Sequence, residues 1–296
     1  MLLNKKKSKY QFFKKTVKYT ILILVGIIIT IIILGGGFGS RNPVLINNGE
    51  PLVFAHRGVT ESNVENSLEA FNKSKELGFS AIETDISRTK DGKLIIFHDD
   101  TAKRLLNSDR HINSMYWQEI EDKYLQYNGK ETKNKVLSLD QFLQQAEKST
   151  VLYLDIKESS KVVADSILIL LEKYNDHKNI IIADANILFV VYLKIKNPNT
   201  KVALEGFNKG KEWLYYILPK NFKPDFYSSF ISQVDENHML FLKKNNLLNN
   251  RIVYGVDNTT ISDVVNLGLR NIIFDYESKT NELKKLELLL NKNKYH

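Results

Sequence analysis

Residues 53–58 read VFAHRG, a short apolar run that ends in His56, Arg57 and Gly58. A second apolar run, LIIFH at 94–98, closes on His98. Similar runs recur along the chain and alternate with helical stretches, which is typical of repeated strand–helix units. The strands predicted in this way are 52–55, 81–86, 94–97, 151–156, 179–183, 202–205, 225–229, 251–255 and 271–274.

The helices predicted between these strands have recognisable ends. In SLEAFNKSKEL at 67–77, Asn66 is the expected N-cap, Glu69 follows three residues later, and Gly78 comes just past the end. Further helices are predicted at 138–148, 160–174, 186–195, 235–245 and 259–267.

Strands that alternate with helices indicate a parallel sheet. Eight such units close a TIM (β/α)8 barrel of about 250 residues, and residues 51–296 supply that length. The nine predicted strands exceed by one the eight that such a barrel contains. The stretch 87–93 contains the turn signal Asp91-Gly92 and is too short for a helix. Residues 94–97 are therefore either the return arm of a hairpin or a barrel strand without its helix. Residues 99–136 are interpreted as an insertion over one end of the barrel.

The excess positive charge of the chain is confined to its start. Of the 42 Lys and Arg, eight lie in residues 1–41, so 34 remain to balance the 34 Asp and Glu, all of which lie in 42–296. This balance argues against a nucleic-acid surface on the body of the protein.

Residues 19–40 run without a charge and suit a transmembrane helix, which needs about 20 apolar residues. Seven lysines precede this segment and place the N-terminus in the cytoplasm. A cleaved signal peptide is the alternative, but no A-x-A-like site is present. The expected organisation is a basic cytoplasmic tail at 1–18, a single-pass helix at 19–40, a linker at 41–50 and an extracellular catalytic domain at 51–296.

Three carboxylates point to a cation site. Glu83 and Asp85 lie two positions apart on one predicted strand, so both face the same side. Asp155 ends another strand and shares its face with Lys157. Buried carboxylates are costly without a countercharge, and oxygen ligands suit Ca²⁺ or Mg²⁺. The competing interpretation is a salt-bridge network with Lys157 and Arg57.

The two histidines complete a site for a phosphate ester. In a barrel of this kind, the ends of the strands gather on one face, which brings His56 and His98 near the carboxylates. One histidine can take a proton from the nucleophile while the other gives one to the leaving oxygen. Arg57 and Lys157 supply positive charge for the phosphoryl oxygens.

Four stretches in this order resemble the glycerophosphodiester phosphodiesterase family, as a membrane-anchored bacterial member: FAHRG, VENSLEAF, AIETDISRTKDGKLIIFHDD and LYLDIK. The resemblance covers residues 51–157 and implies a metal-dependent TIM barrel that hydrolyses glycerophosphodiesters to glycerol phosphate and an alcohol. The residues that match its functional positions are His56 and His98 as the catalytic pair, Arg57 at the phosphate, Lys157 on the fourth strand, and Glu83, Asp85 and Asp155 as metal ligands.

Other positions match the family less closely. Glu65 matches an acid near the metal, and Asn66 matches the asparagine that follows it. The usual fourth-strand glutamate is Asp155 here, and the late W-T-V-N stretch reads YGVD, so Tyr254 stands for the tryptophan. The usual serine-phenylalanine after the fifth strand reads Ala183-Asp184. These departures concern substrate identity more than the reaction.

Two alternatives accompany this interpretation. One is a phospholipase D-like enzyme, related to sphingomyelinase D and lysophospholipase D, which shares the barrel, two histidines and a carboxylate-bound metal. The other is an inactive barrel that binds glycerophosphate polymers resembling teichoic acids. The expected partners are one divalent cation, the membrane, and a glycerophosphodiester, phospholipid or polymer substrate.

Overall fold

The computed structural model describes residues 2–276 except 43, 47–48 and 175–178. The chain divides into two compact units, one made of residues up to 41 together with 213–223 and the other of the remainder. The helix predicted at 160–174 and the strand predicted at 179–183 flank the gap at 175–178.

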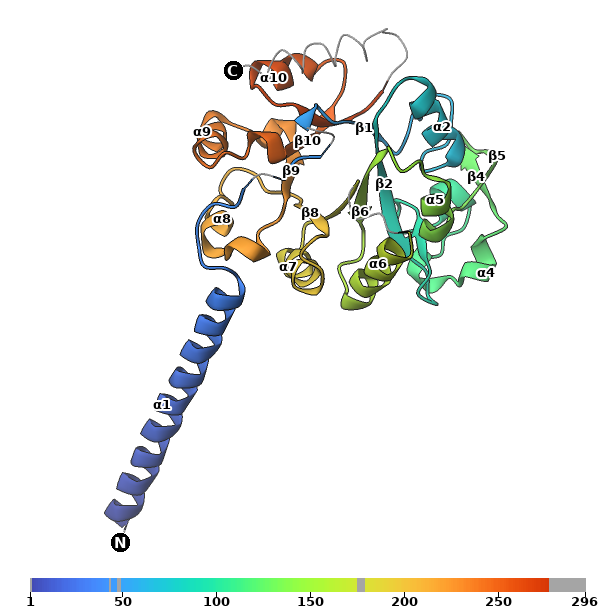
Figure 1. The fold of residues 1–296 in the computed structure, drawn as a ribbon. Helices are drawn as coiled ribbons and strands as arrows, with labels where there is room; N and C mark the ends of the chain where they lie inside the picture. The colour runs from blue at the N-terminus through green and yellow to red at the C-terminus, as the bar shows by residue number, and fades with distance from the viewer. Residues whose placement is uncertain (1, 43, 47–48, 175–178, 277–296) are drawn as a thin grey trace. The chain divides into compact units, whose positions relative to one another are not determined.

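The barrel unit holds eight parallel strands in a closed ring (Figure 1). Strand β1 hydrogen-bonds to both β2 and β11, and this double pairing closes the sheet on itself. The order around the ring follows the sequence, as in a TIM barrel, and the predicted fold class is confirmed. The eight strands are β1 (Val53–His56), β2 (Ala81–Arg88), β6 (Val151–Ile156), β7 (Ile180–Asp184), β8 (Lys201–Leu204), β9 (Phe226–Phe230), β10 (Arg251–Val256) and β11 (Asn271–Phe274).

The interior of the ring alternates large and small side chains. Phe54 and Tyr153 pack edge to face, with their ring centroids 5.6 Å apart. Ala81 on β2, Ala183 on β7 and Ala203 on β8 belong to the same buried cluster. Small residues beside large aromatic ones fill the interior of the ring, so the barrel has a packed core.

Helices surround the barrel strands (Figure 1). They are α2 (Leu68–Glu76), α5 (Leu139–Gln145), α6 (Lys161–Tyr174), α7 (Ile187–Lys196), α9 (Glu236–Lys244) and α10 (Ile261–Asn266). Each lies within a range predicted from the sequence, except that α7 ends one residue beyond its predicted range of 186–195. The expected N-cap of α2 is wrong by one residue. Ser67 caps this helix by accepting a hydrogen bond from the Ala70 amide, while Asn66 has a φ of 56° and lies outside it.

Strand β3 (Leu94–Ile96) decides the question of the ninth strand. It pairs antiparallel with β2, with Ile96 opposite Ile86 and Leu94 opposite Arg88. Residues 94–97 are thus the return arm of a hairpin and lie outside the closed ring. The antiparallel register places Phe97 next to Asp85, whose carbonyl accepts the Phe97 amide, so His98 follows directly at the end of the barrel.

The segment after His98 builds a small layer with its own core. It contains α3 (Lys103–Leu106), a 3-10 helix (Ile112–Ser114), α4 (Trp117–Ile120) and the hairpin of β4 (Tyr124–Tyr127) and β5 (Lys130–Lys135), which the sequence analysis did not predict. Leu105, Ile112 and Ile120 are buried together with Ile95 and Phe97. This shared core ties the segment to β3 and therefore holds His98.

The other unit contains a long helix, α1 (Leu2–Leu34). Its stretch Gln11–Leu34 is long and apolar enough to cross a membrane. The helix starts before the predicted segment 19–40 because lysines are good helix formers. It ends at Leu34 because glycines follow, and Gly36 and Gly37 adopt positive φ angles of 72° and 75°. The same unit contains α8 (Trp213–Ile217) and a 3-10 helix at Lys220–Phe222.

Candidate active site

The C-terminal ends of the barrel strands enclose a cavity of about 270 Å³. Most of the site residues predicted from the sequence line it, namely His56, Arg57, Glu83, His98, Asp155, Lys157 and Tyr254. Asp85 and Asn66 are buried and hydrogen-bond to each other next to these residues. We call this space the central cavity.

A tight turn after β1 places Arg57 at the rim. Arg57 itself has a φ of 54° and Gly58 a φ of 81°. A Cβ atom at Gly58 would lie 2.8 Å from the backbone of Ala70 in α2, so only glycine permits this approach. The turn directs the Arg57 amide toward Glu83, whose carboxylate accepts it at 3.0 Å.

Three carboxylates meet at the centre of the site. Glu83 and Asp85 lie on the same face of β2, and Asp155 is the partner of Asp85 in β6. Ligand atoms of all three lie within 4.8 Å of one another. Burial raises the pKa of Glu83 to about 8, and the negative charge of Asp85 adds to this effect. A buried acidic group without enough countercharge fits a divalent cation held by oxygen ligands.

Two basic side chains also contact these carboxylates. The Lys157 ammonium lies 2.8 Å from Asp85 and 2.5 Å from Asp155. Arg57 Nε lies 3.1 Å from the other oxygen of Asp85. Burial alone would raise the pKa of Asp85, but Lys157 and Arg57 lower it below its usual range. The contacts of the competing salt-bridge interpretation are therefore present. Among the residues that the structure describes, His56 is the one basic side chain at ion-pair distance from Glu83.

Asn66 holds the Asp85 side chain in place through a hydrogen bond. Its amide donates to Asp85 at 2.8 Å, and its carbonyl accepts from the Thr84 hydroxyl at 2.7 Å. The left-handed backbone of Asn66 turns the side chain toward β2. Asparagine is one of the few residues that adopt this conformation readily.

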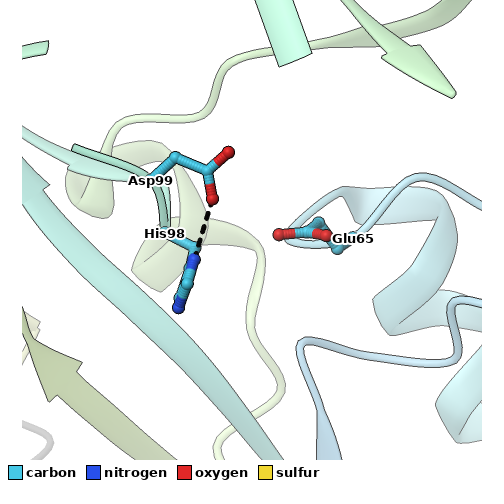
Figure 2. A group of neighbouring side chains, drawn as sticks. All are labelled: Glu65, His98 and Asp99. Carbon is cyan, nitrogen blue, oxygen red and sulfur yellow. Dashed lines mark hydrogen bonds and ion pairs between the residues drawn. The ribbon is translucent and has the colours of Figure 1, made fainter. Parts of the chain in front are cut away.

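Glu65 lies in a different group of side chains. It faces His98 and Asp99 (Figure 2). Arg57 contacts it at 3.1 Å, and Arg104 contacts its two oxygens at 2.6 and 2.8 Å. Arg104 also donates to both oxygens of Asp99 at 2.8 Å. Glu65, His98 and Asp99 thus form a second group whose ligand atoms lie within 4.8 Å of one another, and Arg57 and Arg104 pair with its acids. The role of Glu65 as a metal ligand stays a prediction.

Each of the two histidines has a carboxylate at its Nδ1 atom. His56 Nδ1 lies 2.5 Å from Asp275, and His98 Nδ1 lies 2.8 Å from Asp99 (Figure 2). An occupied Nδ1 fixes the ring orientation and leaves Nε2 for proton transfer. Burial lowers the pKa of His56, but the hydrogen bond to Asp275 and the charge of Glu83 outweigh it, so the pKa is raised.

Three acids that the sequence analysis missed contribute to the site. Asp275 directly follows β11, Glu205 directly follows β8, and Asp99 follows His98. Tyr153 donates a hydrogen bond to Glu205 at 2.8 Å. Burial raises the pKa of Glu205 to about 8, and the charge of Asp155 adds to this effect. The available signal was their position at the ends of predicted strands, where a barrel gathers its functional residues.

The fold and the site define a TIM-barrel protein with a cluster of three carboxylates and two histidines, each hydrogen-bonded to a carboxylate. The sequence profile of the glycerophosphoryl diester phosphodiesterase family matches residues 56–276, so the chain belongs to this family.

Individual relatives agree with this assignment. A glycerophosphodiester phosphodiesterase of Caldanaerobacter subterraneus is 27% identical over 159 residues, which is 52% of this chain and 65% of the relative. A human lysophospholipase D is 26% identical over 143 residues, or 45% of this chain and 44% of the relative. The chain thus spans less than two thirds of the length of these curated relatives.

A solved structure supports the fold. A phosphodiesterase of Oleispira antarctica, in complex with the product sn-glycerol-3-phosphate, superposes with a TM-score of 0.69 at 17% identity. The match covers 80% of this chain and 96% of that one.

Proposed function

We propose that this protein hydrolyses glycerophosphodiesters to glycerol phosphate and an alcohol, with one divalent cation, Ca²⁺ or Mg²⁺. The single observation that carries the proposal is the central cavity itself. It combines two histidines, each held through Nδ1 by a carboxylate, with an acidic cluster and two basic side chains. The family to which the chain belongs supports the same reaction class.

Glu83, Asp85 and Asp155 are the residues that would hold the cation. When bound, such an ion supplies positive charge that stabilises the developing charge on phosphoryl oxygens. Arg57 and Lys157 line the same cavity and add charge for binding the phosphate.

His56 and His98 exchange protons with the reacting oxygens in this proposal. Both line the central cavity, and the Nδ1 atom of each is occupied. One ring accepts a proton from the attacking oxygen, which belongs either to water or to a substrate hydroxyl, as that oxygen forms a bond to phosphorus. The other ring donates a proton to the departing alcohol as its P–O bond breaks, and each ring acts through Nε2. If a substrate hydroxyl attacks, water then opens the cyclic phosphate to give glycerol phosphate. Asp275 and Asp99 position the rings, and Asp275 also stabilises the protonated form of His56.

The test uses the full chain in detergent micelles. We expect turnover of a glycerophosphodiester such as glycerophosphoethanolamine with Ca²⁺ or Mg²⁺, and loss of turnover with a chelator. Release of glycerol phosphate is the readout. Choline release from a lysophospholipid, without activity on the diesters, would instead favour the lysophospholipase D reaction named for the human relative. Binding without turnover of any substrate would favour an inactive barrel.

We also propose that α1 anchors the protein in the cell membrane with its N-terminus in the cytoplasm and the barrel outside. The apolar stretch Gln11–Leu34 and the lysines at the start of the chain support this orientation. Protease treatment of intact cells should digest the barrel. Full protection of the barrel, with digestion only after the cells are lysed, would contradict the orientation.

A further inference from the structure

The short helix α8, which lies between β8 and β9 in the sequence, has an exposed apolar face. Trp213, Tyr216 and Ile217 occupy helical positions i, i+3 and i+4, so their side chains share one side of the helix. Each of the three is more than half exposed. Tyr215 is buried on another side, where the Lys223 ammonium lies 3.6 Å from the centre of its ring. We call Trp213, Tyr216 and Ile217 the α8 face.

The composition of the α8 face suits the boundary between lipid and water. Trp and Tyr combine a large apolar ring with a polar group, and they are enriched where a membrane meets water. Residues 213–223 contain two lysines and no Asp or Glu. An amphipathic segment of this kind can bury its apolar side chains just below the lipid headgroups.

Helix α1 indicates where such a boundary lies along the chain. The helix ends at Leu34, and Arg41 is the first charged residue after the uncharged run 19–40. When α1 spans a membrane, the chain therefore passes from lipid to water between these two residues. Phe38 lies in this passage and is exposed.

The segment after α8 is hydrogen-bonded to the same passage. The amides of Lys220 and Asn221 donate to the carbonyls of Gly37 and Gly35, each at 2.9 Å. The Asn221 side chain donates to the carbonyl of Leu34 at 3.2 Å. These bonds supply partners for carbonyls that the end of a helix leaves open. They also explain why α8 and α1 belong to one compact unit.

We propose that the α8 face inserts into the lipid–water boundary of the membrane that α1 crosses. This inference rests on the proposed membrane anchor and does not depend on the phosphodiesterase reaction. The hydrogen bonds hold α8 at the level where α1 leaves the lipid, so the exposed rings meet headgroups there. The chain then contacts the membrane at two points, α1 and the connection between β8 and β9.

The test measures how close Trp213 comes to lipid. The chain has two tryptophans, so Trp117→Phe leaves Trp213 as the single fluorescent indole. The full chain with this change is reconstituted into phosphatidylcholine vesicles with and without bromine on the acyl chains, because bromine quenches nearby indoles. We expect bromine to remove about half of the Trp213 fluorescence or more, as for a ring at the headgroup and acyl boundary.

Trp213→Phe is the reference, because it keeps Trp117 of the barrel unit as the single tryptophan. Its fluorescence should change less with brominated lipid than that of Trp213. Equal quenching of the two tryptophans would overturn the inference.

A double variant tests the face itself. Tyr216→Ser with Ile217→Ser, in the Trp117→Phe background, should reduce the quenching of Trp213 by about twofold, because the face loses most of its apolar area. Leu240→Ser is the matched control, since Leu240 is an exposed apolar residue of α9 in the barrel unit. It should leave the quenching unchanged. The same quenching in the double variant and the control would contradict the proposal.

Flotation of the vesicles separates failure of the anchor from failure of this inference. A chain that does not float with the vesicles overturns both. A chain that floats while bromine leaves Trp213 fluorescence unchanged overturns the inference alone. Trp213 fluorescence that responds to protein density and not to bromine shows that a second copy covers the α8 face, which also overturns it. None of these readouts requires hydrolysis, so an inactive protein gives the same answer.

Discussion

Asp275 lies 2.5 Å from Nδ1 of His56, although the two residues are 219 positions apart in the sequence. Closure of the barrel causes this contact, because β1 and β11 are hydrogen-bonded neighbours and both residues lie at the same ends of these strands. A carboxylate at Nδ1 favours the protonated ring and fixes its orientation. The pair therefore predicts how the site responds to pH.

Asp275→Asn should lower the pKa of His56, because it removes the charge that raises this pKa against the effect of burial. The ring then loses its proton at a lower pH. A titration of labelled histidine by NMR, in chelator, measures the shift. An unchanged His56 pKa would show that Asp275 does not control this ring.

The same variant should change stability in a pH-dependent way. A raised pKa stabilises the folded state below the unfolded value of about 6.5, and this contribution disappears as pH rises through the folded pKa. The difference in free energy of unfolding between wild type and Asp275→Asn should therefore be largest at acidic pH. Denaturant unfolding at several pH values measures it, and a difference that grows toward alkaline pH would contradict the assignment.

His56→Ala and His98→Ala should each lower turnover by about 10²- to 10⁴-fold, the usual contribution of a general acid or base. Both side chains are about one-third exposed, at 31% and 34%, so the fold should survive their truncation. Circular dichroism and thermal unfolding check the fold. His111→Ala, assayed on glycerophosphoethanolamine, is the control and should retain activity. Full activity of both His56→Ala and His98→Ala would contradict the proposed mechanism.

Addition of Ca²⁺ or Mg²⁺ should stabilise the wild type, by about 2.7 kcal/mol at a concentration 100 times the dissociation constant. Glu83→Gln should lose most of this gain, because it removes one of the three clustered carboxylates. The pKa of Glu83 is raised in the folded protein from its ordinary value of 4.5 to about 8. In chelator, the free energy of unfolding of the wild type should therefore fall as the pH rises between these two values. Thermal unfolding with and without metal measures both effects, and an equal metal gain in Glu83→Gln would exclude this site.

Arg104→Ala should lower kcat/KM by about tenfold or more, as loss of one charged partner does at other sites. Arg104 forms ion pairs with both Glu65 and Asp99. Glu65 in turn pairs with Arg57, and Asp99 holds Nδ1 of His98. Arg110→Ala is the control, because Arg110 forms a solvent-exposed pair with Glu119, and pairs of this kind contribute little to stability. Equal activity of the two variants would show that the Arg104 contacts do not support catalysis.

Much of the architecture was predictable from local patterns. The apolar runs located all eight barrel strands, and the period of two along β2 placed Glu83 and Asp85 on one face. The hairpin β4–β5 was missed because its strands are polar and partly exposed, with the sequences YLQY and KETKNK. The cap of α2 was misassigned because Asn66 and Ser67 are both good N-cap residues, and only the contact with Asp85 separates them.

The sequence by itself determined the fold class and the chemical types at the site, because strand and helix periods and short motifs are local properties of the chain. The tertiary structure decided the direction of β3, the grouping of Glu65 with Arg104, and the entry of Asp275 and Glu205 into the central cavity. These features depend on contacts between residues far apart in the sequence. Such contacts form only when the ring of strands closes and its ends are brought to one face.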